Sequence, residues 1–202
     1  MISVGFSHRM TDGMIIKPFG EKGIPMLQGN IKDVSIIKEN ICALLKKQID
    51  TGDSLEKTQE APVQNGLLLT IPNNVCKESG LLDLIKKITD EYYQDIPIGV
   101  GINKVVEDNI WVGLMKEGDF HILHNHQEIG GIAGGLYLKI PEMIPPQGNI
   151  SWVSDDPVTN TCKVFSWSPK EGDYFVWPSH LIHSVYPFKG PGSRIMISWF
   201  SV

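Results

Sequence analysis

The sequence predicts an α+β protein that is mainly β, in which helices come first and a sandwich or barrel follows. Two observations lead to this fold class. From Ile98 onward the chain consists of short β-rich runs divided by Gly, Pro, Asn and Asp, a spacing typical of sandwiches and barrels. Before Ile98, two segments repeat apolar residues with the period of a helix. The 13 prolines and 20 glycines agree with a chain that is rich in turns.

The first half of the chain contains two predicted helices and two predicted strands. "MIIKPFG" is the only strand-like piece of the first thirty residues, and "LLLTIP" predicts a short buried strand after the polar loop "DTGDSLEKTQEAPVQNG". The helices are expected to pack against one sheet as an N-terminal buttress. Their apolar positions are 31, 34, 37, 41, 44 and 45 in "IKDVSIIKENICALLKKQI", and Leu81, Leu84, Ile85, Ile88 and Tyr92 in "SGLLDLIKKITDEYYQDI", with Ser79 as a possible N-cap.

The β region is expected to form one unit with the preceding helices. A chain of 202 residues is long enough for one well-packed domain and too short for two large ones. We therefore expect a single domain with the buttress over residues 1–97 and the β core over residues 98–202. The predicted strands are "IGVGINKVV", "NIWVGLM", "FHILHNH", "GIAGGLYLKI", "NISWVS", "CKVFSW", "DYFVWP", "HSVYP" and "RIMISWF".

Charge and composition exclude several classes of partner. A formal net charge of -5, without a cluster of Lys or Arg, argues against binding nucleic acid or an anionic membrane. A small molecule or a protein side chain is the expected partner. The apolar runs are far shorter than a membrane span and "MISVGFSHRM" does not resemble a signal peptide, so a cytoplasmic location is expected. Cys42, Cys76 and Cys162 form no CxxC pair and indicate neither a disulfide framework nor a thiolate zinc site.

The stretch "FHILHNHQEIGG" carries half of the 6 histidines of the chain. In a strand successive side chains alternate between faces, so His124, His126 and Glu128 are predicted to point one way and His121 the other. Two imidazoles would then converge on one point, as metal ligands do. Taken alone, an HxH pair is also compatible with ordinary polar residues on a strand.

A second pair of histidines occurs later, in "EGDYFVWPSHLIHSVYP". His183 is followed by strand-like residues, whereas His180 comes just after Pro178 in a predicted turn, so His183 is the predicted ligand and His180 a surface or supporting residue. Two ligands on one strand with a distal histidine in a β-rich context suit a metal inside a double-stranded β-helix. Imidazoles suit Fe(II), but also zinc, copper, nickel or manganese, and the spacing does not choose among them.

These residues resemble those of a known group of enzymes. "EGDFHILHNH", "IAGGLYLKIP", "PQGNISWVSDD", "EGDYFVWPSHLIHSVYP" and "GSRIMISW" look like the 2-oxoglutarate and Fe(II) dependent oxygenases, in particular the branch found in bacteria and phages. The resemblance extends from about Trp111 to Trp199. It implies a jelly-roll core, a metal bound by His124 and His183, and a basic residue after the distal histidine for the far carboxylate of 2-oxoglutarate. Arg194 occupies that place.

The chain departs from the superfamily's pattern at two positions. The superfamily usually has Asp or Glu two residues after the first histidine, where this chain has His126, and often has Ser two residues after the arginine, where it has Met196. Either His126 completes a three-histidine site, or Glu128 moves in as the carboxylate ligand. We predict the ligand set His124, His126 and His183.

Arg194 is the residue that discriminates best between possible functions. In "GSRIMISWF" alternation places Arg194, Met196 and Ser198 on one face of a strand and Ile195, Ile197 and Trp199 on the other. The turn "KGPG" is expected to fold this strand back beside the strand of His183, and the alternative is a surface arginine. If Tyr137 in "GGLYLKI" faces inward, its hydroxyl would reach the far carboxylate of 2-oxoglutarate as well. The alternative is that Tyr137 is only a packed aromatic ring.

The resemblance therefore implies an enzyme. The expected activity is that of a dioxygenase of the hydroxylase type, dependent on Fe(II) and 2-oxoglutarate, which oxidises an unidentified substrate and releases succinate and carbon dioxide. Two alternatives remain open. "GDFHILHNH" and "GDYFVWPSHLIH" also resemble the two cupin motifs, which would give a metal enzyme that uses no 2-oxoglutarate. The β region could also be a non-catalytic β-sandwich binding module whose histidines are ordinary polar residues.

Overall fold

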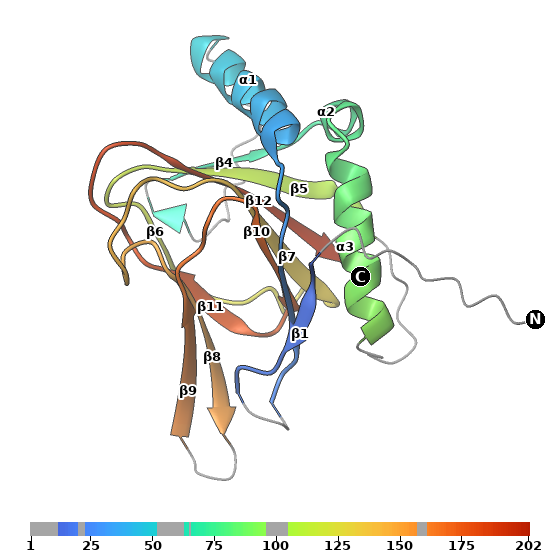
Figure 1. Ribbon diagram of the computed structural model, residues 1–202, viewed down its shortest axis with the longest axis vertical. Coiled ribbons are helices and arrows are strands. Elements are labelled where there is room, and N and C mark those ends of the chain that lie inside the picture. The colour runs from blue at the N-terminus through green and yellow to red at the C-terminus, as the bar shows by residue number, and fades with distance from the viewer. Residues whose placement is uncertain (1–11, 20–22, 52–62, 65, 96–104, 157–160) are drawn as a thin grey trace, which may run out of the picture.

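Two antiparallel sheets face each other in the computed structural model, which describes residues 12–19, 23–51, 63–64, 66–95, 105–156 and 161–202 (Figure 1). The larger sheet contains β1 (Met14–Ile16), β2 (Met26–Asn30), β4 (Leu67–Thr70), β5 (Val105–Met115), β7 (Ile132–Lys139), β10 (Asp173–Pro178) and β12 (Arg194–Ser201). The smaller sheet contains β3 (Val63–Gln64), β6 (Phe120–His124), β8 (Ile150–Asp156), β9 (Thr161–Trp167) and β11 (Ile182–Val185).

The order of the strands is that of a jelly roll. The larger sheet runs β1-β2-β10-β7-β12-β5-β4 and the smaller runs β3-β6-β11-β8-β9, so the chain from β5 to β12 passes repeatedly from one sheet to the other. The double-stranded β-helix that the sequence implied is thereby confirmed. Strands from the first half of the chain extend both sheets, with β2 paired to β10 and β3 paired to β6.

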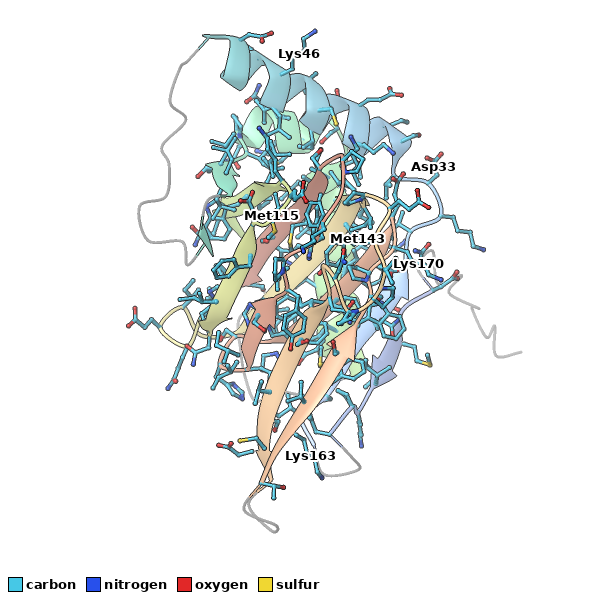
Figure 2. All side chains as sticks on the ribbon, turned by 90° about the vertical axis from the view of Figure 1, so that its left-hand side faces the viewer. Asp33, Lys46, Met115, Met143, Lys163 and Lys170 are labelled. Atoms are coloured by element: carbon cyan, nitrogen blue, oxygen red, sulfur yellow. The ribbon has the colours of Figure 1, made fainter. Side chains whose placement is uncertain are left out.

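The strand β12 shows how residue alternation builds two separate hydrophobic cores. Ile195, Ile197 and Trp199 pack into a cluster with the helices, on the outer face of the larger sheet. Met196 and Phe200 belong to the cluster between the two sheets, where Figure 2 shows side chains filling the interior. The alternation predicted for "RIMISWF" is therefore confirmed. The β8–β9 hairpin, marked by Lys163, extends away from the end of the molecule that carries Lys46 (Figure 2).

The helices cover the outer face of the larger sheet, as predicted (Figure 1). They are α1 (Ser35–Thr51), α2 (Asn73–Glu78) and α3 (Leu81–Asp95). Asp33 accepts hydrogen bonds from the backbone N–H and the hydroxyl of Ser35, at 2.9 and 2.6 Å, which stabilises the first turn of α1. Ser79 does not cap α3: it ends α2, and its hydroxyl donates to the carbonyl of Val75 at 2.7 Å.

The structure corrects three further expectations. The first thirty residues contain a second strand, β2, and the smaller sheet's β6 ends at His124 rather than continuing through His126. The strand of Arg194 does not lie beside that of His183, because β12 pairs with β5 and β7 in the opposite sheet. The segment after β11 therefore crosses between the sheets instead of forming a hairpin. The predicted strand "IGVGINKVV" lies outside the described residues up to position 104, and β5 begins at Val105.

Trp199 attaches the jelly roll to its supporting helix. The side chain is fully buried, and its indole N–H donates to the hydroxyl of Thr89 on α3 at 3.2 Å. Gly134 on the neighbouring strand β7 leaves room for the ring, since a Cβ atom at position 134 would lie 2.1 Å from the indole. Among the residues that the structure describes, no helix is both long and apolar enough to cross a membrane.

We expect Trp199→Ala to lower the free energy of unfolding by about 3–5 kcal/mol, because a large buried side chain is lost and a cavity remains. Urea unfolding followed by circular dichroism measures this difference. Val164→Ala is the control, because Val164 is 63% exposed on β9 and its loss should change stability by less than about 0.5 kcal/mol. Equal effects of the two substitutions would contradict the assigned role of Trp199.

Candidate metal centre

Three histidines come together on the inner side of the smaller sheet. His124, His126 and His183 each offer one ring nitrogen, and these nitrogens all lie within 4.8 Å of one another. The ring centroids of His124 and His183 are 4.2 Å apart, and that of His126 lies 4.9 Å from the first and 5.1 Å from the second. His183, which is distant from His124 and His126 in the sequence, is thus adjacent to both in space.

The pairing of β6 with β11 places His124 directly opposite His183. The Nδ1 atom of His124 lies 2.7 Å from the carbonyl of Ile122, and that of His183 lies 3.0 Å from the carbonyl of Leu181. Only a protonated Nδ1 can donate to these carbonyls, so the lone pair of each neutral ring is on Nε2. The strand placement predicted for His183 is confirmed, and His180 is exposed in the turn that precedes β11.

His126 reaches the group from a turn rather than from a strand. Its backbone N–H donates to the carbonyl of Ser179 at 2.7 Å, and its carbonyl accepts from the N–H of Ile129 at 3.0 Å. The prediction that His124, His126 and Glu128 share one strand face was therefore wrong, since β6 has already ended. Glu128 lies in the turn itself, is exposed, and is not part of the histidine group.

A fourth histidine, His121, also faces inward, contrary to the prediction from alternation. His121 lies opposite Val185 and His124 lies opposite His183. Between these two pairs β6 advances by three residues whereas β11 advances by two, so β6 contains one extra residue. This β-bulge contains Ile122 and Leu123, whose side chains are 50% and 62% exposed on the outside. Because of the extra residue, His121 and His124 point to the same side, and both line one cavity.

Burial keeps these imidazoles neutral. It lowers the pKa of His126 to about 4 and that of His121 to about 3, and it lowers the pKa of His183 well below and that of His124 below the ordinary histidine value. The positive charge of Arg194 and the neighbouring histidines act on His121 in the same direction. A neutral imidazole has a lone pair for a metal, which a protonated one lacks.

Arg194 is the first residue of β12, and its charged side chain is fully buried. Its Nη1 donates to the carbonyl of Gly148 at 2.8 Å, and its Nη2 lies 3.8 Å from the sulfur of Met196. The guanidinium also lies over the ring of Tyr137, 4.7 Å from the centroid. Tyr137 faces inward and is 1% exposed, so the surface position considered for Arg194 is wrong and the inward orientation considered for Tyr137 is correct.

A cavity of about 600 Å³ opens at the histidines. Its walls are largely apolar, with Trp111 and Phe200 among them, and Gln127 and Glu128 also line it. Met196 lines the cavity whereas Arg194 does not, so the sulfur of Met196 stands between the cavity surface and the guanidinium that it contacts.

Comparison with known proteins agrees with this arrangement. Residues 109–199 match the family model described as "Putative 2OG-Fe(II) oxygenase". This part of the chain is similar to the 2OG-Fe(II) oxygenases. The match begins within β5 and ends within β12, and it includes His124, His126, His183 and Arg194. The oxygenase function expected from the sequence is thus confirmed at the level of the family, with Fe(II) and 2-oxoglutarate as the cofactors of that family.

Solved structures of other oxygenases share the fold. A prolyl-4-hydroxylase of Pseudomonas putida has a TM-score of 0.64 at 16% identity, with 87% of this chain and 91% of that chain covered. A prolyl hydroxylase of Trichoplax adhaerens, in complex with a peptide, has a TM-score of 0.58 at 15% identity, with 94% and 82% covered. The carbocyclase SnoK of nogalamycin biosynthesis has a TM-score of 0.62 at 10% identity, with 87% and 78% covered. A search of curated proteins found no match.

The buried histidines should make the metal-free oxygenase sensitive to acid. Their folded pKa values lie below the value of about 6.5 in an unfolded chain, so the unfolded state binds more protons and stability falls as the pH falls from about 6.5 toward 4. One such residue contributes a slope of up to about 1.4 kcal/mol per pH unit. Urea unfolding at pH 6.5 and at pH 5 measures how the free energy of unfolding depends on pH. His121→Phe should make this dependence weaker. An unchanged slope would contradict the buried, neutral state of His121.

Proposed function

We propose that the protein is an oxygenase of the hydroxylase type in which His124, His126 and His183 bind Fe(II), and Arg194 with Tyr137 binds the far carboxylate of 2-oxoglutarate. The observation that carries this proposal is the presence, within one jelly-roll interior, of three convergent neutral imidazoles and a fully buried arginine. Each half of the site suits one of the two cofactors.

The histidine group fits a divalent metal. Imidazole nitrogen is a ligand that iron accepts, and the three histidines would hold the ion without enclosing it completely. Hydrogen bonds from Nδ1 of His124 and His183 to backbone carbonyls fix the orientation of both rings, as is usual for histidine ligands. With His126 in place of a carboxylate, the protein would leave the charge of the metal uncompensated, which favours binding of an anionic cosubstrate.

The surroundings of Arg194 fit a carboxylate. No ion pair of Arg194 with an acidic residue is found in the described part of the chain, although a buried charge normally needs a partner. The Nε atom of Arg194 and the hydroxyl of Tyr137 are buried without a hydrogen-bond partner. A carboxylate bound there would accept hydrogen bonds from both groups and pair with the guanidinium. Met196 has an unbranched, flexible side chain that can turn aside to admit it.

When bound, iron and 2-oxoglutarate supply the oxidising chemistry, with release of succinate and carbon dioxide. The protein contributes binding, orientation and exclusion of water. Arg194 and Tyr137 would hold one end of the keto acid, and the histidines would hold the metal at the other. Trp177 packs edge-on against His183 with its ring centroid 5.0 Å away, which limits movement of that imidazole and keeps the inner side of the site apolar.

The cavity suggests the kind of substrate that the enzyme hydroxylates. Its apolar walls, with Trp111 and Phe200, favour a substrate that presents an aliphatic C–H group to the metal. Glu128 and Gln127, which line the same cavity, offer hydrogen-bond acceptors for a donor group on that substrate. A small molecule or a protein side chain with these two features would fit.

Single substitutions of the three ligands should strongly weaken metal binding. We expect His124→Ala, His126→Ala and His183→Ala each to weaken Fe(II) binding by more than about 100-fold, because even a residue that only orients a ligand contributes about 10- to 100-fold. Anaerobic Fe(II) titration in the presence of 2-oxoglutarate, followed by the visible charge-transfer band and by metal analysis, measures the effect. His180→Ala is the matched control, since His180 is exposed in the nearby turn. Full metal occupancy without His183 would refute the ligand set.

Arg194→Ala should weaken 2-oxoglutarate binding while leaving metal content nearly unchanged. Loss of a buried charge-assisted contact costs about 2–5 kcal/mol, which is about thirty-fold to several-thousand-fold in affinity. Calorimetry of the metal-loaded protein without oxygen provides the measurement. Lys189→Ala, at an exposed position before β12, is the control for a general loss of positive charge. Equal keto-acid affinity in the wild type and Arg194→Ala would show that the arginine is not the carboxylate site.

A further inference from the structure

We propose that His121 is a further binding residue for 2-oxoglutarate, and that it donates a hydrogen bond to the same far carboxylate that Arg194 holds. This inference rests on the proposed function, because it concerns the cosubstrate of that site. Three observations support it: the bulge that turns His121 inward, its position between the metal centre and Arg194, and the buried donors around the guanidinium that lack an acceptor.

The register of the smaller sheet places His121 one step deeper than the metal centre. Along β11, His183 faces His124, and two residues further Val185 faces His121. A step of two residues along a strand is about 6.6 Å. His121 therefore lies below His124 on the inner face of the sheet, at a distance that excludes it from the three-histidine group but keeps it in the same cavity.

Arg194 is connected to the part of the chain that follows Val185, beyond His121 as seen from the metal centre. The chain continues from Val185 to Pro187, whose carbonyl accepts a hydrogen bond from the N–H of Gly148 at 3.1 Å. The carbonyl of Gly148 in turn accepts from Arg194 Nη1 at 2.8 Å. This connectivity favours the order metal centre, then His121, then Arg194 along the interior. A five-carbon dicarboxylate that reached from the metal to the guanidinium would then pass close to His121.

The far carboxylate is the part of the cosubstrate that His121 would contact. Arg194 is close enough to His121 for its positive charge to lower the pKa of the His121 imidazole, in addition to the effect of burial. A carboxylate has about four positions for hydrogen bonds, and Arg194 already uses Nη1 for Gly148. Met196, which touches the guanidinium, has no hydrogen to donate. A ring N–H from the opposite sheet would add a further donor to Arg194 Nε and the Tyr137 hydroxyl, which the larger sheet supplies.

The bulge itself gives a reason to assign a function to this side chain. Without the extra residue in β6, His121 would point to the outer face, where Ile122 and Leu123 are now exposed. Bulges leave ladder hydrogen bonds unmade and are common next to active sites, where they redirect a side chain. Here the side chain that is redirected is an imidazole beside a buried cation.

Calorimetry with two keto acids tests the proposal. The protein is loaded with Mn(II) in place of iron, without oxygen, and titrated with 2-oxoglutarate and with 2-oxopentanoate, which has a methyl group in place of the far carboxylate. We expect His121→Phe to weaken 2-oxoglutarate by about tenfold or more, since a hydrogen bond to a charged group is lost. Binding of 2-oxopentanoate and of Mn(II) should stay within about twofold. His121→Gln, which keeps an N–H donor, should recover part of the affinity.

Leu123→Ala is the matched control, because Leu123 lies in the same bulge with its side chain 62% exposed, and its affinities should equal those of the wild type. Several results would overturn the proposal. Equal weakening of both keto acids by His121→Phe would place the contact at the metal end, and loss of Mn(II) affinity would place His121 at the metal itself. Unchanged 2-oxoglutarate binding in His121→Phe would overturn the inference alone, whereas a wild-type protein that binds no 2-oxoglutarate would overturn the proposed function as well.

Discussion

The pairing of β6 with β11 is the constraint on which the whole site depends. It sets His124 opposite His183, and through the bulge it also sets His121 opposite Val185. A shift of one residue in this register would turn His183 outward and His124 away from it, because side chains alternate along a strand. The same strand β11 pairs on its other side with β8, where His183 faces the fully buried Trp152, so the register is fixed by packing on both sides.

The electrostatics of the interior follow from the absence of a carboxylate among the three grouped histidines. The interior holds neutral imidazoles and a buried guanidinium, and burial also raises the pKa of the Tyr137 hydroxyl so that it stays protonated. A metal ion would add positive charge to this interior. Such an arrangement is unfavourable when empty and favourable once an anion is bound, which makes anion binding and the stability of the inner core dependent on each other.

Much of the fold and of the site could be predicted from the sequence, since β12 alternates strictly and its charged face was correctly assigned to Arg194, Met196 and Ser198. His183 was placed on a strand for similar local reasons. The inward position of His121 could not be predicted, because a bulge depends on the partner strand and the local pattern shows only alternation. The sheet to which Arg194 belongs was missed because the segment between β11 and β12 is compatible with either a hairpin or a crossing.

His126 differs from the other members of the group in how it is held, and this connects the metal centre to the cavity entrance. The turn that carries it is attached at both ends to one residue: Ser179 accepts from the N–H of His126 at 2.7 Å and donates its own N–H to the carbonyl of Gly131 at 3.0 Å. Gln127 and Glu128, which line the cavity, belong to that turn. A substrate that contacts these two side chains therefore acts on the backbone adjacent to His126. His124 and His183, which are held in strands, would keep their positions, so any adjustment of the group on substrate binding falls on His126.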